Sequence, residues 1–407
     1  MAKVRQLRCM KCEKGYDFGP EIICPDCGLD GILDVEYDYD EMRSALKDRP
    51  LKDRPERNIF RYVDMLPLSQ SPPSMLSVGW TPLYSFPRLN RKLGNDHVHI
   101  KDDTVNPSAS LKDRASAVAI GMALEAGNPG IACASTGNAA SSLAVLSASA
   151  GLDSYIFVPE TIPKPKLYQI GACATRVFRV KGTYEDAFDV ATAAIDKWGW
   201  YNRNCAINPY LVEGKKTCSL EIYEQLGYKV PDWVVVSMGD GCIISGQWKA
   251  FKELRLLGET DRVPKLLGVQ ARGCKPIVDA CVECCDVTPV EATTIADSIR
   301  VGEPRNWRKA LRALKESGGT AVSVTDEEIV SAMLMLSREA GVFAEPAGAT
   351  GFAGLRVAIE QGIIGKDETV AVLITGSGLK DPSSLDGALD IADIPADVEA
   401  VAAHMNT

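Results

Sequence analysis

The sequence predicts an α/β protein whose parallel sheets are covered by helices on both faces, and three patterns support this. Short apolar runs, such as those within "GIACAST" and "DWVVVSMGDG", have the continuous hydrophobicity of buried parallel strands. Segments of helical length alternate with these runs along most of the chain. Glycine turns follow three of the runs, at 134–138, 238–243 and 374–378. Because ligands of such folds bind at the carboxyl ends of the strands, we expect the functional site at these turns.

Composition and charge narrow the class of protein. The chain has 407 residues, of which 46% are hydrophobic, and this is enough for more than one domain. A net charge of −9, a pI near 5.1 and the lack of a basic patch with interspersed aromatic residues argue against a nucleic-acid partner. No apolar run reaches the roughly 18 residues of a membrane span, and the first residues lack the apolar core of a signal peptide. We therefore expect a cytoplasmic protein with no membrane partner.

Four of the 13 cysteines form a pattern within residues 1–35. Cys9-x2-Cys12 is followed, after eleven residues, by Cys24-x2-Cys27, and both pairs lie near turn-forming residues. Two such pairs offer four thiolates to a tetrahedral Zn²⁺, which leaves no open position for catalysis. The favoured interpretation is therefore a zinc ribbon with a structural metal. The alternatives are two disulfides, which a reducing cytosol disfavours, and a ribbon without its metal.

The tetrapeptide "LKDR" occurs three times, in different surroundings. The copies at 46–49 and 51–54 are each followed by proline in a charged stretch, which is typical of a solvated linker or a short surface turn. The copy at 111–114 follows small, turn-forming residues and opens a helical pattern. A lysine in that position can be desolvated, which lowers the pKa of its amine toward that of a usable nucleophile. Lys112 is therefore the candidate catalytic residue.

Several common catalytic arrangements are absent from the sequence. The only histidines are His97, His99 and His404, and two of these lie one residue apart in a predicted strand. A Ser/His/Asp triad or a histidine metal site is hard to build from them. The phosphate-binding pattern GxxxxGK[ST] does not occur either. The chemistry must then come from a bound cofactor, or from a lysine and the backbone.

The order of the motifs resembles that of one known family. The motifs are, in sequence, "GWTPL", "NPSASLKDRAS", "ASTGNAASSLAVLSASAGL", "INPYLVEGKKT", "MGDGCIISGQWKAFKEL" and "LITGSGLKDP". From about Cys9 to Pro382 the chain resembles threonine synthase and its paralogues, which are pyridoxal-phosphate (PLP) enzymes of fold type II. The resemblance implies two doubly wound parallel-sheet domains behind the zinc ribbon. It also implies bound PLP, a structural Zn²⁺, a small amino-acid substrate and a homodimer.

This family divides the chain into five expected parts. They are a zinc ribbon (1–35), a connector with the first part of a large PLP domain (36–105), a smaller, mobile α/β domain (106–205), the rest of the large PLP domain (206–387) and a C-terminal tail (388–407).

The resemblance assigns roles to individual residues. Lys112 is expected to hold PLP as a Schiff base and to move the substrate proton. Asn138 is expected to bind the ring hydroxyl of PLP, and Thr375 to face its pyridine nitrogen. The residues expected to bind the cofactor are Lys112, Asn138, Gly239, Asp240, Gly241, Cys242, Ile243 and Thr375. The residues expected to bind substrate are Ser110, Ser135, Thr136, Gly137, Asn138, Asn208 and Lys215. Asp240 stands where the family more often has asparagine, and its carboxylate must point away from a phosphate.

The expected reaction starts with elimination of a leaving group, expected to be phosphate, from a small amino acid, followed by addition of a nucleophile. Threonine synthase converts O-phosphohomoserine and water into threonine and phosphate. The family segment "NSxNPxRxEGQKT" is "NCAINPYLVEGKKT" here, so Ala206 and Leu211 replace the serine and arginine expected to bind the substrate's phosphate. Lys215 replaces a glutamine, and it offers the substrate's phosphate a positive charge from another position in place of the missing arginine. Three alternatives follow: replacement of the phosphate of phosphoserine by sulfite, as in cysteate synthase; β-elimination from serine or threonine; and a catalytically inactive amino-acid-binding relative.

Overall fold

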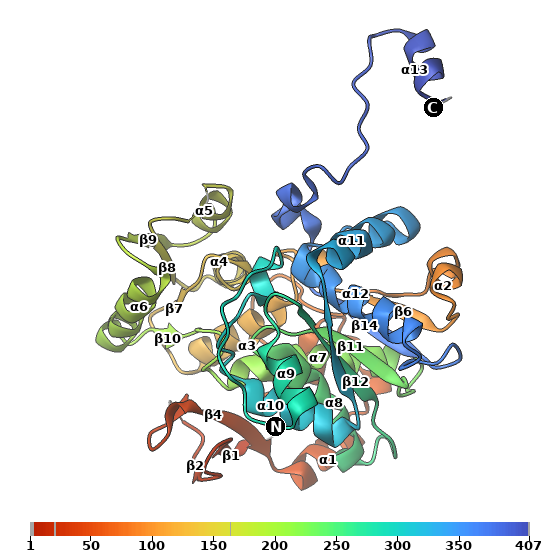
Figure 1. The fold of residues 1–407 in the computed structure, drawn as a ribbon. Coiled ribbons are helices and arrows are strands. Elements are labelled where there is room, and N and C mark those ends of the chain that lie inside the picture. The colour runs from red at the N-terminus through yellow and green to blue at the C-terminus, as the bar shows by residue number, and fades with distance from the viewer. Residues whose placement is uncertain (1–3, 20–21, 163, 406–407) are drawn as a thin grey trace.

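A six-stranded sheet forms the centre of the larger part of the molecule in the computed structural model, which describes residues 4–19, 22–162 and 164–405 (Figure 1). The strand order is β13-β12-β11-β14-β6-β5, and neighbours are parallel except for β5 at the edge. The strands are β13 (Thr320–Val324), β12 (Lys265–Ala271), β11 (Trp233–Ser237), β14 (Val370–Ile374), β6 (Val98–Asp102) and β5 (Leu83–Tyr84).

Helices cover both faces of this sheet because side chains alternate along each strand. On β11, Val234 and Val236 belong to one hydrophobic core, whereas Trp233 and Val235 belong to the other. The first core is shared with α7 (Tyr210–Gln225), α8 (Cys242–Leu257), α9 (Pro276–Glu283) and α10 (Trp307–Ser317). The second is shared with α2 (Pro87–Leu93), α11 (Asp326–Ala340) and α12 (Pro346–Glu360).

A second sheet has four strands, all parallel, in the order β10-β7-β8-β9. The strands are β7 (Ile131–Ala134), β8 (Ser154–Pro159), β9 (Arg176–Val180) and β10 (Tyr201–Asn202). Its helices are α4 (Asn138–Ala150), α5 (Lys164–Gly171) and α6 (Tyr184–Trp198), and α3 (Lys112–Glu125) packs against both α4 and α7. The expectation of two parallel sheets, each with helices on both faces, is therefore confirmed.

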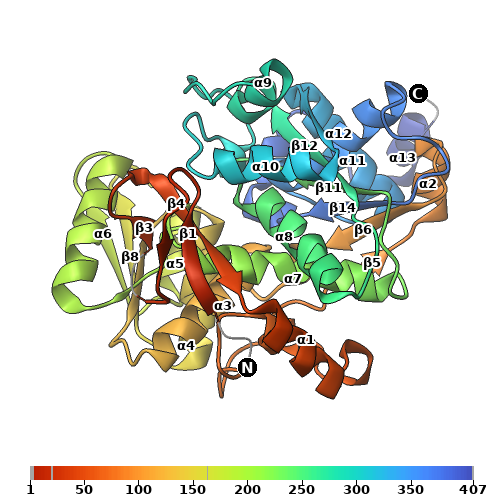
Figure 2. The same ribbon diagram turned by 90° about the horizontal axis from the view of Figure 1, so that it is seen from below.

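The N-terminal residues form a third, antiparallel sheet with the order β2-β1-β4-β3. Its strands are β1 (Val4–Cys9), β2 (Gly15–Tyr16), β3 (Ile23–Cys24) and β4 (Gly28–Tyr37), and α1 (Tyr39–Asp48) follows them. Figures 1 and 2 show this sheet at one side of the two parallel-sheet units. At the other end of the chain, residues after the turn at 382–387 leave the body of the molecule and end in α13 (Val398–Met405) (Figure 1).

The first two "LKDR" copies differ from the expected solvated linker in one respect. The first ends α1 and the second forms the short 3-10 helix η1 (Leu51–Asp53), and Lys47 and Lys52 are exposed as expected. Arg54, however, is buried, because the backbone carbonyls of Arg49 and Arg61 and an ion pair with Asp64 at 2.7 Å satisfy its guanidinium. In the part of the chain that the structure describes, no helix combines the length and the apolar character that a membrane span requires.

Candidate active site

Lys112 is the first residue of α3 and is half-buried. The loop before it lies along the segment that follows β14: the Leu111 N–H donates to the Thr375 carbonyl at 2.9 Å, and the Ser377 N–H donates to the Ala109 carbonyl at 3.0 Å. Ala109 has φ +60°, a left-handed conformation that turns the chain into the helix. The pairing fixes Lys112 beside the carboxyl end of β14, where the sequence predicted a ligand.

A buried ion-pair network holds the first turn of α3 in place. The fully buried guanidinium of Arg114 donates to Asp103 at 2.7 and 2.8 Å and to Glu221 of α7 at 2.8 Å. Asp113 accepts hydrogen bonds from both the N–H and the hydroxyl of Ser108. The two residues that follow Lys112 are therefore structural, and they leave Lys112 itself to face the site.

The glycine turn after β7 leads into a cavity. The cavity contains about 420 Å³ not filled by atoms and is lined by the turn, by α5 and by the starts of η4 (Asp297–Ile299) and α12. Thr136, Gly137 and Asn138 line it as predicted for a substrate site, and Ser135 lies beside them, with its hydroxyl 3.3 Å from the Gly137 N–H. The Asn138 amide is occupied by a residue the sequence did not single out, because its Nδ2 donates to Glu345 at 2.8 Å.

The turn from β11 into α8 has the form of an anion cradle. Gly241 caps α8 with φ +91°, and a Cβ added there would lie 2.9 Å from the Asn306 carbonyl. Among the described residues, none accepts a hydrogen bond from the N–H groups of Gly241, Cys242 or Ile243. The Asp240 carboxylate faces the Arg305 N–H at 3.3 Å. Such an orientation leaves the helix N-terminus open to a phosphate.

The charge of Lys112 acts on one carboxyl group in the cradle and on one in the cavity. Burial raises the pKa of Asp240, and it raises the pKa of Glu345 to about 7, while the charge of Lys112 opposes both shifts. Ser110, two residues before Lys112, is fully buried, and its hydroxyl has no hydrogen-bond partner among the described residues. An unsatisfied hydroxyl, an open helix N-terminus and an amine in one place fit a phosphorylated aldehyde cofactor such as PLP.

The segment 204–216 contains the departures from the family pattern. Leu211 is fully buried in the hydrophobic core, so it offers no substitute for a guanidinium. Asn208 is used locally: its amide donates to the Asn202 carbonyl at 2.8 Å and accepts from the Tyr210 N–H at 2.9 Å. Its contact with substrate remains a prediction.

Lys215 is fully buried, and among the described residues its amine makes one hydrogen bond, to the Cys205 thiol at 3.8 Å. A hydrogen bond from Cys242, together with the charges of Lys215, Lys112 and Arg203, lowers the pKa of Cys205 despite its burial. Three positive charges thus act on one thiol, and Lys215 has no carboxylate partner among the described residues. The region around Lys215 is therefore suited to a ligand with negative charge.

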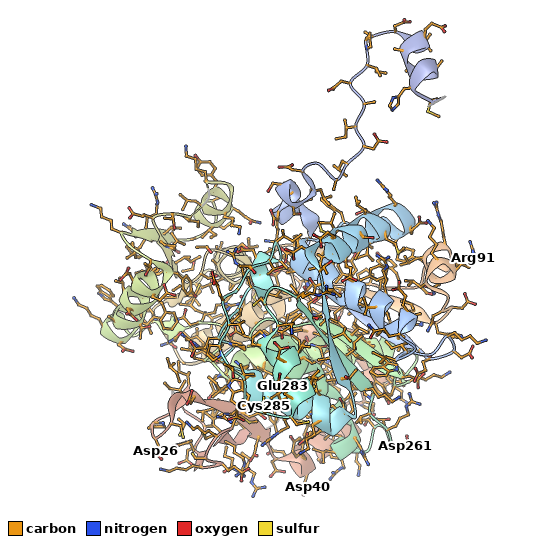
Figure 3. All side chains as sticks on the ribbon, viewed as in Figure 1. Asp26, Asp40, Arg91, Asp261, Glu283 and Cys285 are labelled. Carbon is orange, nitrogen blue, oxygen red and sulfur yellow. The ribbon has the colours of Figure 1, made fainter. Side chains whose placement is uncertain are left out.

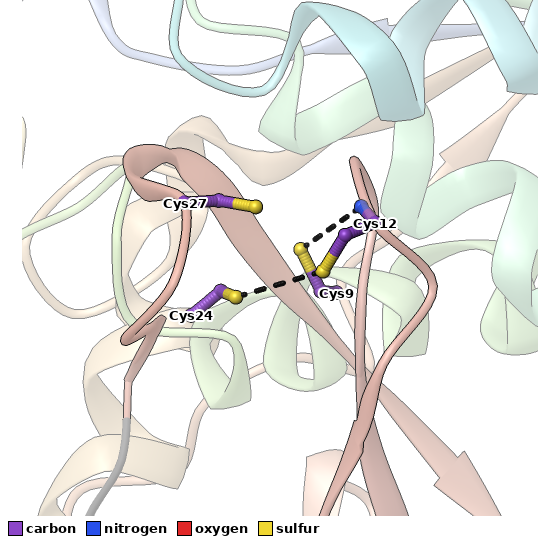
Figure 4. A group of neighbouring side chains, drawn as sticks. All are labelled: Cys9, Cys12, Cys24 and Cys27. Atoms are coloured by element: carbon purple, nitrogen blue, oxygen red, sulfur yellow. Dashed lines mark hydrogen bonds between the residues drawn. The ribbon is translucent and has the colours of Figure 1, made fainter.

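The four N-terminal cysteines come together as the spacing predicted (Figure 4). Their sulfur atoms all lie within 4.8 Å of one another, and those of Cys12 and Cys24 are 3.8 Å apart. A tetrahedral ion with Zn–S bonds of about 2.3 Å places its sulfurs about 3.8 Å apart. The cluster therefore has the size and donor set of a Cys₄ zinc site. By contrast, Cys285 lies on the outer surface near Glu283 (Figure 3).

The comparisons with known proteins agree with this geometry. Residues 75–376 match the family described as pyridoxal-phosphate dependent enzyme. The threonine synthase of Methanocaldococcus jannaschii is 41% identical over 396 residues, which cover 96% of each chain. The chain belongs to the threonine synthase family of pyridoxal-phosphate-dependent enzymes. Among other members of the threonine synthase family, that of Methanosarcina acetivorans is 39% identical and covers 97% of this chain and 96% of its own.

Solved structures support the fold of this family. The processed form of threonine deaminase isoform 2 from Solanum lycopersicum has a TM-score of 0.66 at 24% identity, over 75% of this chain and 86% of its own. Maize serine racemase has a TM-score of 0.65 at 20% identity, over 80% and 93%. The chain is a PLP-dependent enzyme of fold type II and a lyase of the threonine synthase type.

Four residues of the site were not found from the sequence: Ser298, Glu345, Lys380 and Cys205. Glu345 and Lys380 had a local signal, because Glu345 directly precedes the proline that starts α12 and Lys380 lies within the quoted motif "LITGSGLKDP". Cys205 lies within the quoted segment "NCAINPYLVEGKKT" but was not singled out there, and Ser298 had no local signal. They reach the site only because their loops fold over it.

Proposed function

We propose that this enzyme is a threonine synthase, which removes phosphate from O-phosphohomoserine and adds water to give threonine. The observation that carries the proposal is Lys215, a fully buried cation with no carboxylate partner among the described residues. A buried ammonium whose neighbouring anion is at most the Cys205 thiolate is only partly compensated, and a phosphate dianion from the substrate would complete its neutralisation. A substrate without a phosphate would leave this cost in place.

Different residues of the site would bind the cofactor, transfer the proton and bind the substrate. The N–H groups of Gly241, Cys242 and Ile243 would hold the phosphate of PLP, and Asn138 and Thr375 would face its ring. When bound, PLP stabilises negative charge at the substrate's α-carbon. Lys112 would hold the cofactor and then transfer the α-proton, since it starts α3 beside the carboxyl end of β14. The turn of Ser135, Thr136 and Gly137 would bind the substrate carboxylate, with the Ser110 hydroxyl beside the amine.

Phosphate release decides between this reaction and the alternatives. The purified holoenzyme is given O-phosphohomoserine, phosphoserine with sulfite, or threonine, and inorganic phosphate and products are measured. We expect phosphate and threonine from O-phosphohomoserine. Turnover of phosphoserine without turnover of O-phosphohomoserine would refute the proposal. The loss of the family's arginine at Leu211 favours phosphoserine chemistry as the second candidate, because a shorter substrate places its phosphate elsewhere.

We also propose a structural Zn²⁺ bound by Cys9, Cys12, Cys24 and Cys27, and a homodimer in the cytoplasm. The sulfur spacing supports the metal, and the family resemblance supports the dimer. Residues 106–205 are proposed to form the smaller, mobile domain. The cavity lies between Gln169 of α5 and Glu345 of α12, so movement of this unit would close the cavity over substrate.

A further inference from the structure

Glu345 is buried in the cavity at the point where three segments meet. It caps α12, is 5% exposed, and its N–H donates to the Gly376 carbonyl at 3.0 Å. A Cβ added to Gly376 would lie 2.3 Å from the Glu345 carboxylate, so the carboxylate lies directly on the backbone that follows Thr375. Its other contact is Nδ2 of Asn138, 2.8 Å away. Glu345 therefore joins two segments predicted to bind the PLP ring.

The charges around Glu345 come from several elements. Burial raises the pKa of Glu345 to about 7, while Lys380, the Asn138 hydrogen bond and Lys112 oppose that shift and Asp381 adds to it. Lys166 and Asp297 line the same cavity and pair with each other at 2.6 Å. Glu345 can thus gain or lose a proton near neutral pH, while its N–H stays bonded to the Gly376 carbonyl in this structure.

The protonation state of Glu345 decides whether the orientation of the Asn138 carboxamide is fixed. An ionised carboxylate can only accept, so it must be met by Nδ2 of Asn138. A protonated carboxyl keeps an acceptor oxygen and gains a donor, so either end of the amide can meet it and the orientation is no longer fixed. The two orientations present opposite polarity to any group bound in the cavity.

We propose that Glu345 is a positioning residue, which in its ionised form fixes the Asn138 carboxamide so that the amide donates a hydrogen bond to the bound cofactor. This inference rests on the proposed function, since it uses the predicted contact of Asn138 with the PLP ring. The inference goes beyond the proposed function because it assigns an ionisable group, Glu345, that controls the contact between Asn138 and the PLP ring. At acid pH the protonated carboxyl no longer holds the amide in this orientation.

The absorbance spectrum of the holoenzyme tests the inference without any substrate. The spectrum of the bound cofactor is recorded from pH 5 to pH 9 for wild type, Glu345→Gln and Glu345→Asp, with Glu360→Gln as the matched control. Glu360 lies exposed at the other end of the same helix. We expect a single-proton spectral change in wild type and Glu360→Gln that is absent in Glu345→Gln. In Glu345→Asp the shorter side chain cannot reach Asn138, and the change should also be lost.

Kinetics add a second measurement. For the substrate that the enzyme turns over, Glu345→Gln should lower kcat about tenfold, because a charge-assisted hydrogen bond is replaced by a neutral one, and should leave KM within about threefold. Persistence of the spectral change in a folded Glu345→Gln or Glu345→Asp variant would overturn the inference. Failure of wild type to use O-phosphohomoserine would instead refute only the proposed function, because the spectral experiment contains no substrate.

Discussion

Position, rather than local sequence, makes Lys112 different from the two lysines that share its tetrapeptide. Lys47 ends α1 and Lys52 lies in η1, and both are exposed. Lys112 starts α3 beside the segment that follows β14, and its charge acts on the buried carboxyls of Asp240 and Glu345. The same four residues can therefore be a surface turn or part of an active site, according to which strand ends lie next to them.

Replacing Lys112 gives the first prediction. Lys112→Ala should abolish turnover and the visible absorbance of covalently held cofactor, because no other amine would take its place at the start of α3. Lys52→Ala, which changes the same tetrapeptide on the surface, should leave both unchanged. The spectrum and the rate of phosphate release are measured on both variants. Activity retained by Lys112→Ala would show that another group does the chemistry.

Replacing Lys215 with the glutamine usual in the family gives the second prediction. Lys215→Gln removes a charged contact with the substrate's phosphate, worth roughly 1.5–3 kcal/mol, and this corresponds to a tenfold to hundredfold rise in KM. The kcat should change less, because Lys112 and the cofactor contacts remain. Steady-state kinetics with O-phosphohomoserine provide the measurement. An unchanged KM would remove Lys215 from the substrate site.

The site could be predicted from the sequence only where its residues lie in short, ordered motifs. Lys112, the turn at 135–138 and the cradle at 239–243 each follow a strand or open a helix, so spacing and residue type identify them. Glu345 meets Asn138 although the two lie 207 positions apart in the sequence, and no local pattern encodes that contact. The environment of Cys205 is of the same kind, since its thiol meets Lys215 and Cys242 only after the loop has folded.

At the scale of elements, the N-terminal sheet docks on α7, the helix that carries Lys215. The ring of Phe18 packs edge-to-face on Tyr210 at 5.6 Å, and the Tyr210 hydroxyl donates to the Gly19 carbonyl at 2.9 Å. Further along, the Tyr37 hydroxyl donates to Glu213 at 2.7 Å. The sequence predicted the ribbon, but not this docking, because it depends on isolated side chains far apart in the chain.

Loss of the ribbon's ligand set gives the third prediction. Cys24→Ser should lower the zinc content from about one ion per chain and reduce the Tm by several degrees, because a metal bound only in the native state stabilises it. Cys285→Ser, which changes an exposed cysteine outside the ribbon, should alter neither. Metal analysis and thermal unfolding are the measurements. A Cys24→Ser variant with unchanged zinc and Tm but a slower chemical step would contradict a structural role.

At the scale of the whole molecule, a buried charge network joins α3, β6 and α7. Glu221 of α7 accepts from Arg114 of α3 at 2.8 Å and pairs with Lys101 of β6 at 2.7 Å, and all three side chains are fully buried. The strand and helix positions were predictable from hydrophobic patterns. The charge network was not predictable, because arginine, lysine and glutamate usually lie on the surface and nothing in the sequence marks these three as buried.

Acid stability gives the last prediction. Burial disfavours the ionised form of Glu221, but the charges of Arg114 and Lys101 outweigh it and lower its pKa from 4.5 to about 2. A carboxyl whose pKa is lower in the folded state contributes stability above its unfolded pKa and loses that contribution as the pH falls toward its folded pKa. Glu221→Gln should therefore reduce the free energy of unfolding at pH 7 by about 3 kcal/mol, since it leaves Arg114 and Lys101 short of a partner. The difference from wild type should shrink between pH 5 and pH 3, whereas the exposed Glu303→Gln should match wild type throughout. Urea unfolding across this range measures both, and a difference that stays constant with pH would mean that Glu221 acts by packing and not by charge.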